Sequence, residues 1–254
     1  MTSLARKEII MDSLIENVKR IREEIAAAAA ETGRASEEIK IVPATKTVSA
    51  ERINLLKDIG IDTIGENRVQ ELLEKYDALD KSFHIHFIGK LQTNKVKYII
   101  DKVDMIQSVD SIKLCTEISK RAKAIGRVME VLVEVNIGHE ETKSGVMPEM
   151  LVDFVREASK FDGLKIVGLM VIPPVFSTEN QNAGIASQKV YNCEAYFKKV
   201  KELSLDILNE NIDNVSMREL SMGMSSDYCE AVKCGATIVR PGRAIFGERN
   251  YKKI

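Results

Sequence analysis

Lys46 is the residue whose position offers the clearest chemistry, because it follows a short apolar run and precedes the start of a helix. Ser49 is suited to cap that helix. A lysine at the end of a buried strand has its amine over the top of the sheet, and burial disfavours the charged ammonium form. The free amine is a nucleophile that forms Schiff bases with aldehydes and ketones. Lys46 is therefore our candidate Schiff-base lysine, although its position alone also fits a solvated surface lysine.

Two polar segments near the end of the chain are suited to bind an anion. Residues 221–226 are small and polar and directly precede a helix, and Arg240, Gly242 and Arg243 follow a later apolar run. Helix N-termini and exposed backbone N–H groups favour anions, and barrel enzymes often bind phosphate after strands seven and eight. The alternative is that the glycines only make turns and that Arg240 makes a structural ion pair. Combined with Lys46, a phosphate site indicates a phosphorylated aldehyde, either pyridoxal 5′-phosphate (PLP) or the sugar phosphate of a Schiff-base aldolase.

The histidines and cysteines do not indicate a metal site. His84 and His86 alternate on one apolar run, but no third carboxylate ligand is evident beside them. The cysteines lack the spacing of a zinc site, and we interpret them as reduced thiols of a cytosolic protein. They are Cys115, Cys193, Cys229 and Cys234.

Composition excludes several classes of protein. The 254 residues are 44% hydrophobic, which suffices for a large core, and the formal net charge is only -1. No basic stripe carries interleaved aromatic residues, so we expect no nucleic-acid partner. No run approaches the roughly 20 apolar residues of a membrane span, and the first residues do not form a signal-peptide core. We therefore predict a cytoplasmic protein with no membrane partner.

The elements that position Lys46 alternate regularly along the chain. A leading amphipathic helix has apolar residues at steps of three and four and stops near Gly33. Eight apolar runs follow, at residues 39–44, 62–65, 84–89, 105–109, 130–135, 165–170, 216–222 and 236–239. Helical patterns lie between them, at residues 50–58, 69–79, 94–100, 111–125, 149–159, 187–209 and 227–233. Residues 173–184 are expected to form a loop after the sixth strand.

This alternation predicts an α/β fold. Eight nearly continuous apolar strands with intervening helices are typical of a (β/α)₈ TIM-type barrel, here with an extra N-terminal helix. An open doubly wound sheet is the alternative, but eight units in this length favour closure. No linker-like stretch is visible, so we expect a single domain over residues 1–254.

Several segments together resemble the pyridoxal phosphate homeostasis proteins, the YggS/PROSC family of PLP-binding barrels. They occur in family order over nearly the whole chain, and jointly they are highly specific. The segments are Ala-Thr-Lys-Thr-Val at 44–48, Gly-Glu-Asn-Arg-Val-Gln-Glu at 65–71, His-Phe-Ile-Gly-Lys-Leu-Gln-Thr-Asn-Lys at 86–95, Thr-Lys-Ser-Gly at 142–145, Gly-Leu-Met at 168–170, Leu-Ser-Met-Gly-Met-Ser-Ser-Asp at 220–227, Val-Arg at 239–240 and Ala-Ile-Phe-Gly at 244–247.

The resemblance implies a barrel like the N-terminal domain of alanine racemase, with PLP held as a Schiff base on Lys46. It places the remaining residues by position. Ser221, Gly242 and Arg243 would lie near the phosphate, Arg240 near the ring nitrogen or the phosphate, and Asn67 and His86 in the ring pocket. This chain departs from the family at Arg243, where many members have serine or threonine, and at Pro241, which is usually aliphatic. A guanidinium would replace the hydroxyl contact there, or Arg243 would point away.

The resemblance also implies a role in intracellular PLP (vitamin B6) homeostasis, with PLP-dependent apoenzymes as recipients. Alanine racemase needs a second base, a tyrosine supplied by its C-terminal domain, whereas this chain ends at Ile254 just after the eighth unit. We therefore expect a monomer or weak dimer that binds PLP without strong turnover, hence not an enzyme. The alternative is a PLP-dependent racemase-like enzyme that uses Lys46 with a water or Tyr228.

Overall fold

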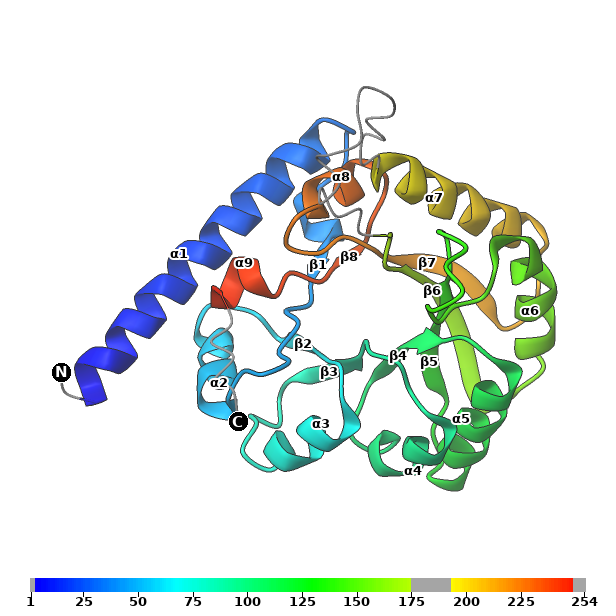
Figure 1. Ribbon diagram of the computed structural model, residues 1–254, viewed down its shortest axis with the longest axis horizontal. Coiled ribbons are helices and arrows are strands. Elements are labelled where there is room, and N and C mark those ends of the chain that lie inside the picture. Colours follow the sequence, from blue (N-terminus) through cyan, green and yellow to red (C-terminus); the bar gives the residue numbers. More distant parts are fainter. Residues whose placement is uncertain (1–2, 175–192, 249–254) are drawn as a thin grey trace, which may run out of the picture.

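Eight parallel strands form a ring with helices around its outside in the computed structural model, which describes residues 3–174 and 193–248 (Figure 1). The strands follow one another around the sheet in the order β1-β8-β7-β6-β5-β4-β3-β2. Their bounds are Lys40–Ile41 (β1), Thr63–Glu66 (β2), His84–Phe87 (β3), Met105–Val109 (β4), Met129–Val135 (β5), Leu164–Val171 (β6), Val215–Ser221 (β7) and Ile238–Val239 (β8).

The two ends of this order meet through backbone hydrogen bonds beyond β1. The N–H of Gly65 donates to the carbonyl of Pro43 at 2.8 Å, and the N–H of Thr45 donates to the carbonyl of Gly65 at 2.9 Å. A parallel bridge joins Ala44 to Gly65 at the same place. The sheet therefore closes into a barrel, which confirms the predicted TIM-type fold and fixes the backbone on both sides of the Lys46 segment.

The helices alternate with the strands as the sequence predicts. Their bounds are Ser3–Ala30 (α1), Ala50–Asp58 (α2), Val69–Tyr76 (α3), Val96–Ile99 (α4), Ile112–Ala124 (α5), Leu151–Ala158 (α6), Cys193–Asn209 (α7), Tyr228–Lys233 (α8) and Arg243–Phe246 (α9). Short 3₁₀ turns lie at Ser36–Glu38 (η1), Thr93–Lys95 (η2) and Pro148–Met150 (η3). The predicted start of the helix at 187 and most of the predicted loop at 173–184 lie outside the described residues.

The barrel interior is filled by its own apolar cluster. Side chains from four of the strands (β4, β5, β6 and β8) and from the extension of β1 meet there, and each is almost fully buried. The cluster is Val42, Met105, Leu132, Val167, Met170 and Ile238. Because these side chains fill the middle of the barrel, a ligand has no room there, and in such barrels the site lies above this layer at the carboxyl ends of the strands.

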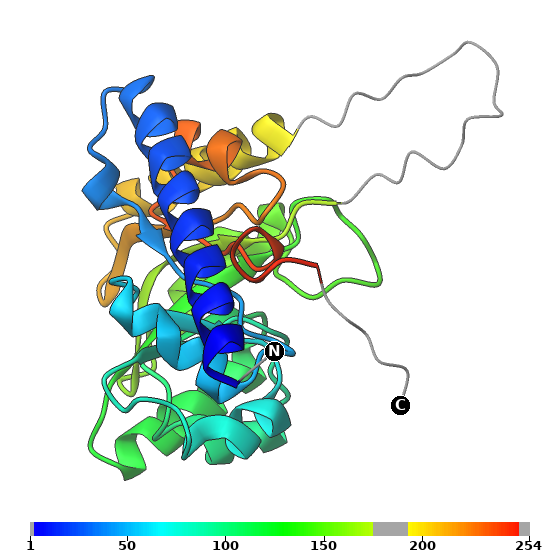
Figure 2. The ribbon, with the colours of Figure 1, turned by 90° about the vertical axis from the view of Figure 1, so that its left-hand side faces the viewer.

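Helix α1 packs along the flank of the barrel beside α8 and α9 (Figure 2). Its buried stripe includes Leu14, Val18 and Ile21, each at most 1% exposed. The amide of Asn17 also donates to the carbonyl of Ile245 at 3.0 Å, which ties α1 to the segment after β8. The extra N-terminal helix therefore supports the loop that carries Gly242 and Arg243. Over the part of the chain described, no helix is both long and apolar enough to cross a membrane.

Candidate functional site

A cavity of about 540 Å³ lies where the strands end at their carboxyl termini. This volume is in the range of small-molecule pockets. It brings together five of the seven predicted site residues: Lys46, Asn67, Arg240, Gly242 and Arg243. The other residues that line it are Ala44, Ile88, Ile172, Met224, Ser225, Ser226 and Glu248.

Lys46 lies between this cavity and a smaller one of about 180 Å³, which Gly242 and Arg243 also line. It follows the extension of β1 and is half-buried, as expected for a lysine at the end of a barrel strand. The preceding Thr45 is fully buried. Lys46 thus lies beside the loop after β8 that the sequence indicates as an anion site.

The loops after β7 and β8 converge on the hydroxyl of Ser225. This Oγ accepts from the N–H of Gly242 at 3.0 Å and from the N–H of Ala244 at 3.1 Å. Gly223 makes the turn possible, since its φ is +91° and an added Cβ would lie 2.6 Å from Cβ of Ala231. Both backbone donors are therefore satisfied by this hydroxyl, which lines the cavity beside Gly242. A phosphate oxygen that took the place of the hydroxyl would meet the same two N–H donors.

Ser221 and His86 are not among the residues that line the cavity; they belong to a buried row of hydrogen bonds that begins at Arg240. Nη1 of Arg240 donates to Oγ of Ser221 at 2.7 Å, and Ser221 donates to Oε1 of Gln107 at 2.6 Å. Nε2 of Gln107 lies 2.8 Å from Nδ1 of His86. Nη2 of Arg240 donates to the carbonyl of Val171 at 2.8 Å. The row therefore fixes the guanidinium that faces the cavity.

Sequence reasoning missed Gln107, which links Ser221 to His86. The sequence gives only a weak indication of this role. Gln107 and Ser108 are polar residues inside the otherwise apolar run of β4, and nothing in the local sequence shows which partner they have. Both are buried. A buried polar side chain in a strand needs a partner, and the partner here is another polar side chain of the barrel interior.

Burial sets the charge of both ends of this row. It lowers the pKa of Arg240 to about 10, against the opposing effect of the Glu134 and Asp227 carboxylates, so the guanidinium stays protonated at neutral pH. Burial, followed by the charges of Lys40 and His84, lowers the pKa of His86 to about 3. His86 is therefore neutral, and its Nδ1 accepts the hydrogen bond that Gln107 donates.

Asn67 lines the cavity and also carries a buried acceptor. Its Oδ1 has no hydrogen-bond partner among the described residues, although it is shielded from solvent. Buried polar atoms are usually paired, so this acceptor would reach a ligand donor only if the side chain turned toward the cavity. Arg243, in contrast, is exposed at the rim, and its guanidinium is not part of the buried row.

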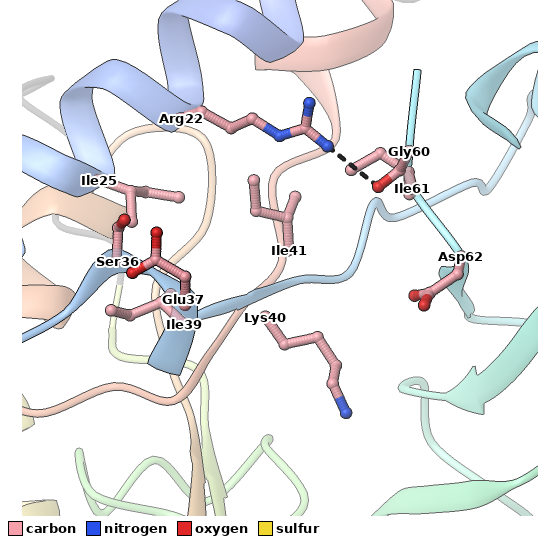
Figure 3. Close-up of a pocket in the computed structure, with 10 residues that line it drawn as sticks. All are labelled: Arg22, Ile25, Ser36, Glu37, Ile39, Lys40, Ile41, Gly60, Ile61 and Asp62. Atoms are coloured by element: carbon pink, nitrogen blue, oxygen red, sulfur yellow. Dashed lines mark hydrogen bonds between the residues drawn. The ribbon is translucent and has the colours of Figure 1, made fainter. Parts of the chain in front are cut away.

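A second cavity, of about 400 Å³, lies at the opposite end of β1 (Figure 3). It is lined by charged residues of both signs, among them Arg22, Glu37, Lys40 and Asp62. Nη2 of Arg22 donates to the carbonyl of Gly60 at 3.0 Å. None of the predicted site residues lies there, and no cluster of three or more metal-ligating side chains occurs among residues 3–174 and 193–248. The cavity beside Lys46 is therefore the candidate site.

Comparison with known proteins agrees with this geometry. The family model of the alanine racemase N-terminal domain matches residues 9–250. A pyridoxal phosphate homeostasis protein of Aquifex aeolicus is 44% identical over 237 residues, which cover 93% of this chain and 98% of that protein. The chain belongs to the pyridoxal phosphate homeostasis protein family. The protein of that name in Escherichia coli K12 is 32% identical over 247 residues, which cover 96% and 100% of the two chains.

Solved structures similar to this homeostasis-family chain show the same barrel. A protein of Bifidobacterium adolescentis described as unknown matches with a TM-score of 0.82 and 34% identity, covering 94% of this chain and 96% of that one. PipY of Synechococcus elongatus, solved with PLP bound, matches with a TM-score of 0.76 and 27% identity, covering 92% and 100%. Alanine racemase of Clostridium difficile, at 18% identity and a TM-score of 0.69, shares the fold over 58% of its own length. The family resemblance seen in the sequence is thus confirmed.

Proposed function

We propose that this chain binds PLP on Lys46 and acts in intracellular PLP homeostasis. The observation that carries the proposal is one cavity that joins a strand-end lysine to Ser225 and Gly242, where the loops after β7 and β8 meet. The names of the relatives and the PLP-bound PipY structure support it. In this role the protein holds PLP and delivers it to PLP-dependent apoenzymes of the cytoplasm, as a monomer or weak dimer.

The residues of the cavity fit PLP group by group. Lys46 would hold the aldehyde carbon through its Nζ. The phosphate would bind at Ser225, either to its hydroxyl or in its place as the acceptor of the Gly242 and Ala244 N–H groups, and Arg243 would add charge at the rim. Arg240 and Asn67 line the same cavity, and their side chains are the polar groups that we assign to the ring. When bound, PLP supplies a reactive aldehyde and an electron-withdrawing ring.

Titration of the purified wild-type protein with PLP tests this proposal. We expect a visible absorption band that borohydride removes as it fixes the cofactor to the chain, with the adduct found by mass spectrometry on the peptide that contains Lys46. Labelling spread over exposed lysines, or a spectrum equal to that of free PLP, would contradict covalent binding at Lys46.

We further propose that turnover is weak or absent. Tyr228, the candidate second base, is 4% exposed, and its hydroxyl donates to the carboxylate of Glu24 on α1, outside the barrel. It therefore cannot face Lys46 across the cavity in this arrangement. We expect no solvent deuterium at Cα of amino acids incubated with the PLP-loaded protein in D₂O, measured by NMR. Continuous incorporation of deuterium at Cα, at a rate typical of racemases, would support the racemase-like alternative.

Gly89→Ala is expected to weaken PLP binding by about tenfold or more, since small displacements of a binding group have large effects. A Cβ at position 89 would lie 2.1 Å from the carbonyl oxygen of Asn67 and 2.8 Å from its Cα, so Asn67 must move. Fluorescence or absorbance titration measures the change. Gly126→Ala is the matched control: its φ is +68° and no atom lies within 4 Å of the added Cβ. Gly126→Ala should lower stability but leave the affinity for PLP unchanged. If Gly89→Ala bound PLP as tightly as Gly126→Ala, Asn67 would have no role in PLP binding.

A further inference from the structure

A buried charge cluster lies beneath the segment that carries Lys46. Its centre is Lys75 of α3, which is only 8% exposed. The Nζ of Lys75 forms ion pairs with Oε1 of Glu66 at 2.8 Å and with Oε1 of Glu71 at 3.1 Å. The ammonium of this buried lysine is therefore paired on two sides by carboxylates.

The same Nζ also donates hydrogen bonds to two backbone carbonyls on either side of Lys46. It donates to the carbonyl of Thr45 at 3.0 Å and to the carbonyl of Val48 at 3.3 Å. An ion pair that stabilised only α3 would not need hydrogen bonds to the loop that carries Lys46. The contacts of Lys75 are concentrated on residues that flank the candidate Schiff-base lysine.

The two carboxylates bind the same loop from their own side. Oε1 of Glu71 accepts the N–H of Thr47, and Oε1 of Glu66 accepts the hydroxyl of Thr45. Both residues next to Lys46 in the chain are therefore held by the cluster, Thr45 through its carbonyl and side chain and Thr47 through its N–H. Glu66 is fully buried, so its position is set by the end of β2.

Thr47 adopts a backbone conformation that needs such support. Its φ is +66°, which for a β-branched residue is a rare left-handed conformation. Strained residues of this kind persist where surrounding contacts determine the backbone, and they cluster at functional sites. Here the strain lies directly after Lys46, and the contact that holds it is the N–H bond to Glu71.

We propose that Lys75, together with Glu66 and Glu71, is a positioning group that fixes Lys46 for condensation with the cofactor aldehyde, in which Nζ would bond to the aldehyde carbon and the aldehyde oxygen would leave as water. This inference rests on the proposed PLP binding. Lys75 is not among the residues that line the cavity, so we expect it to act through its neighbours and not by contact with the cofactor. Its role is to hold the peptide units on both sides of Lys46, so that the amine is presented to the cavity before the cofactor arrives. Such preorganisation acts on the rate of the covalent step.

The test separates the covalent step from binding of the ring and phosphate. Stopped-flow absorbance follows adduct formation with PLP, and pyridoxine 5′-phosphate, whose alcohol cannot react with an amine, reports on the cavity alone. For Lys75→Met we expect the rate of adduct formation to fall about tenfold or more, with the Kd for pyridoxine 5′-phosphate within about twofold of wild type. Lys81→Met, at an exposed lysine just beyond α3, is the matched control and should behave as wild type.

Two outcomes would overturn the inference. An unchanged rate in Lys75→Met would show that the cluster does not position Lys46, and an equal loss for both ligands would show general loosening of the barrel. If Lys75→Met does not fold by circular dichroism, Glu71→Gln carries the test, because it leaves the Glu66–Lys75 pair and weakens the acceptor that Thr47 and Lys75 share. Its rate should fall about threefold to tenfold, and an unchanged rate would again overturn the inference.

Failure of the proposed function gives a different result. In that case the wild-type protein itself forms no adduct with PLP, and the positioning role falls with it. A normal wild type with normal Lys75→Met and Glu71→Gln variants overturns the positioning role alone.

Discussion

Lys46→Ala is expected to abolish both the visible band with PLP and the borohydride-stable adduct. Within the described ranges, Lys46 is the only lysine that lines the cavity, so no other primary amine is placed to replace it. The groups assigned to the phosphate and ring are untouched by the substitution. We therefore expect the variant to bind pyridoxine 5′-phosphate with a Kd within about threefold of wild type, because the bonds that hold this ligand do not involve the amine.

Two further variants sharpen this result. Lys46→Arg keeps a positive charge at the cavity but cannot form a Schiff base, so it should also lack the adduct. Lys90→Ala removes an exposed lysine that follows β3 and should form the adduct as wild type does. A band and adduct that survive in Lys46→Ala would place the anchor elsewhere and would remove the central residue of the proposed function.

The position of Lys46 could be predicted because a barrel places its chemistry at strand ends, and strand ends can be recognised in a sequence. The same holds for Gly242 and Arg243, which follow the last apolar run and line the same cavity. What these residues do in detail depends on neighbours that are distant in sequence. Gln107, which bonds to Ser221 across 114 positions, is an example that no local pattern reveals.

The Lys75 cluster also depends on contacts between residues that are distant in the sequence. In the sequence Lys75 is one of several charged residues of a helical pattern, where the usual interpretation is a solvated face. Its burial follows from the packing of α3 against the extension of β1, which closes the barrel. Contacts that depend on closure cannot be predicted before the closed fold is known.

The ends of the first and last strands differ from the prediction for a local reason. The predicted strand at 39–44 is reduced to Lys40–Ile41, and the one at 236–239 to Ile238–Val239. Pro43 and Pro241 lie just beyond them and have no N–H to donate to a ladder. Pairing continues only through single bonds, such as that from the N–H of Val42 to the carbonyl of Val239 at 2.9 Å. The chain there is extended without a regular ladder, and it is this stretch that leads into the Lys46 loop.

His86→Asn is expected to make the protein less sensitive to acid. The folded-state pKa of His86 is about 3, because burial penalises its charged form, whereas an unfolded histidine has a pKa of 6.5. As the pH falls below 6.5, the unfolded chain therefore takes up a proton that the folded chain refuses. The stability that neutral His86 contributes is present above pH 6.5 and is lost as the pH falls toward 3. At about 1.4 kcal/mol per pH unit, the loss over this window is on the order of 4–5 kcal/mol.

A loss of this size matters because folded domains are stable by only about 5–15 kcal/mol. Asparagine does not titrate, and its side-chain oxygen can accept the hydrogen bond that Gln107 donates to Nδ1. We expect His86→Asn to be about 1–2 kcal/mol less stable than wild type at neutral pH, because it leaves a small cavity. Its free energy of unfolding, measured with urea from pH 7 to pH 4, should fall much less steeply.

His84→Asn is the control for this slope. His84 lies on the same strand, two residues earlier, but its side chain is exposed. Its free energy of unfolding should follow the wild-type pH dependence. If His86→Asn kept the full wild-type slope instead, the acid sensitivity would arise elsewhere, and His86 would not be the neutral end of the hydrogen-bonded row that holds Arg240 at the cavity.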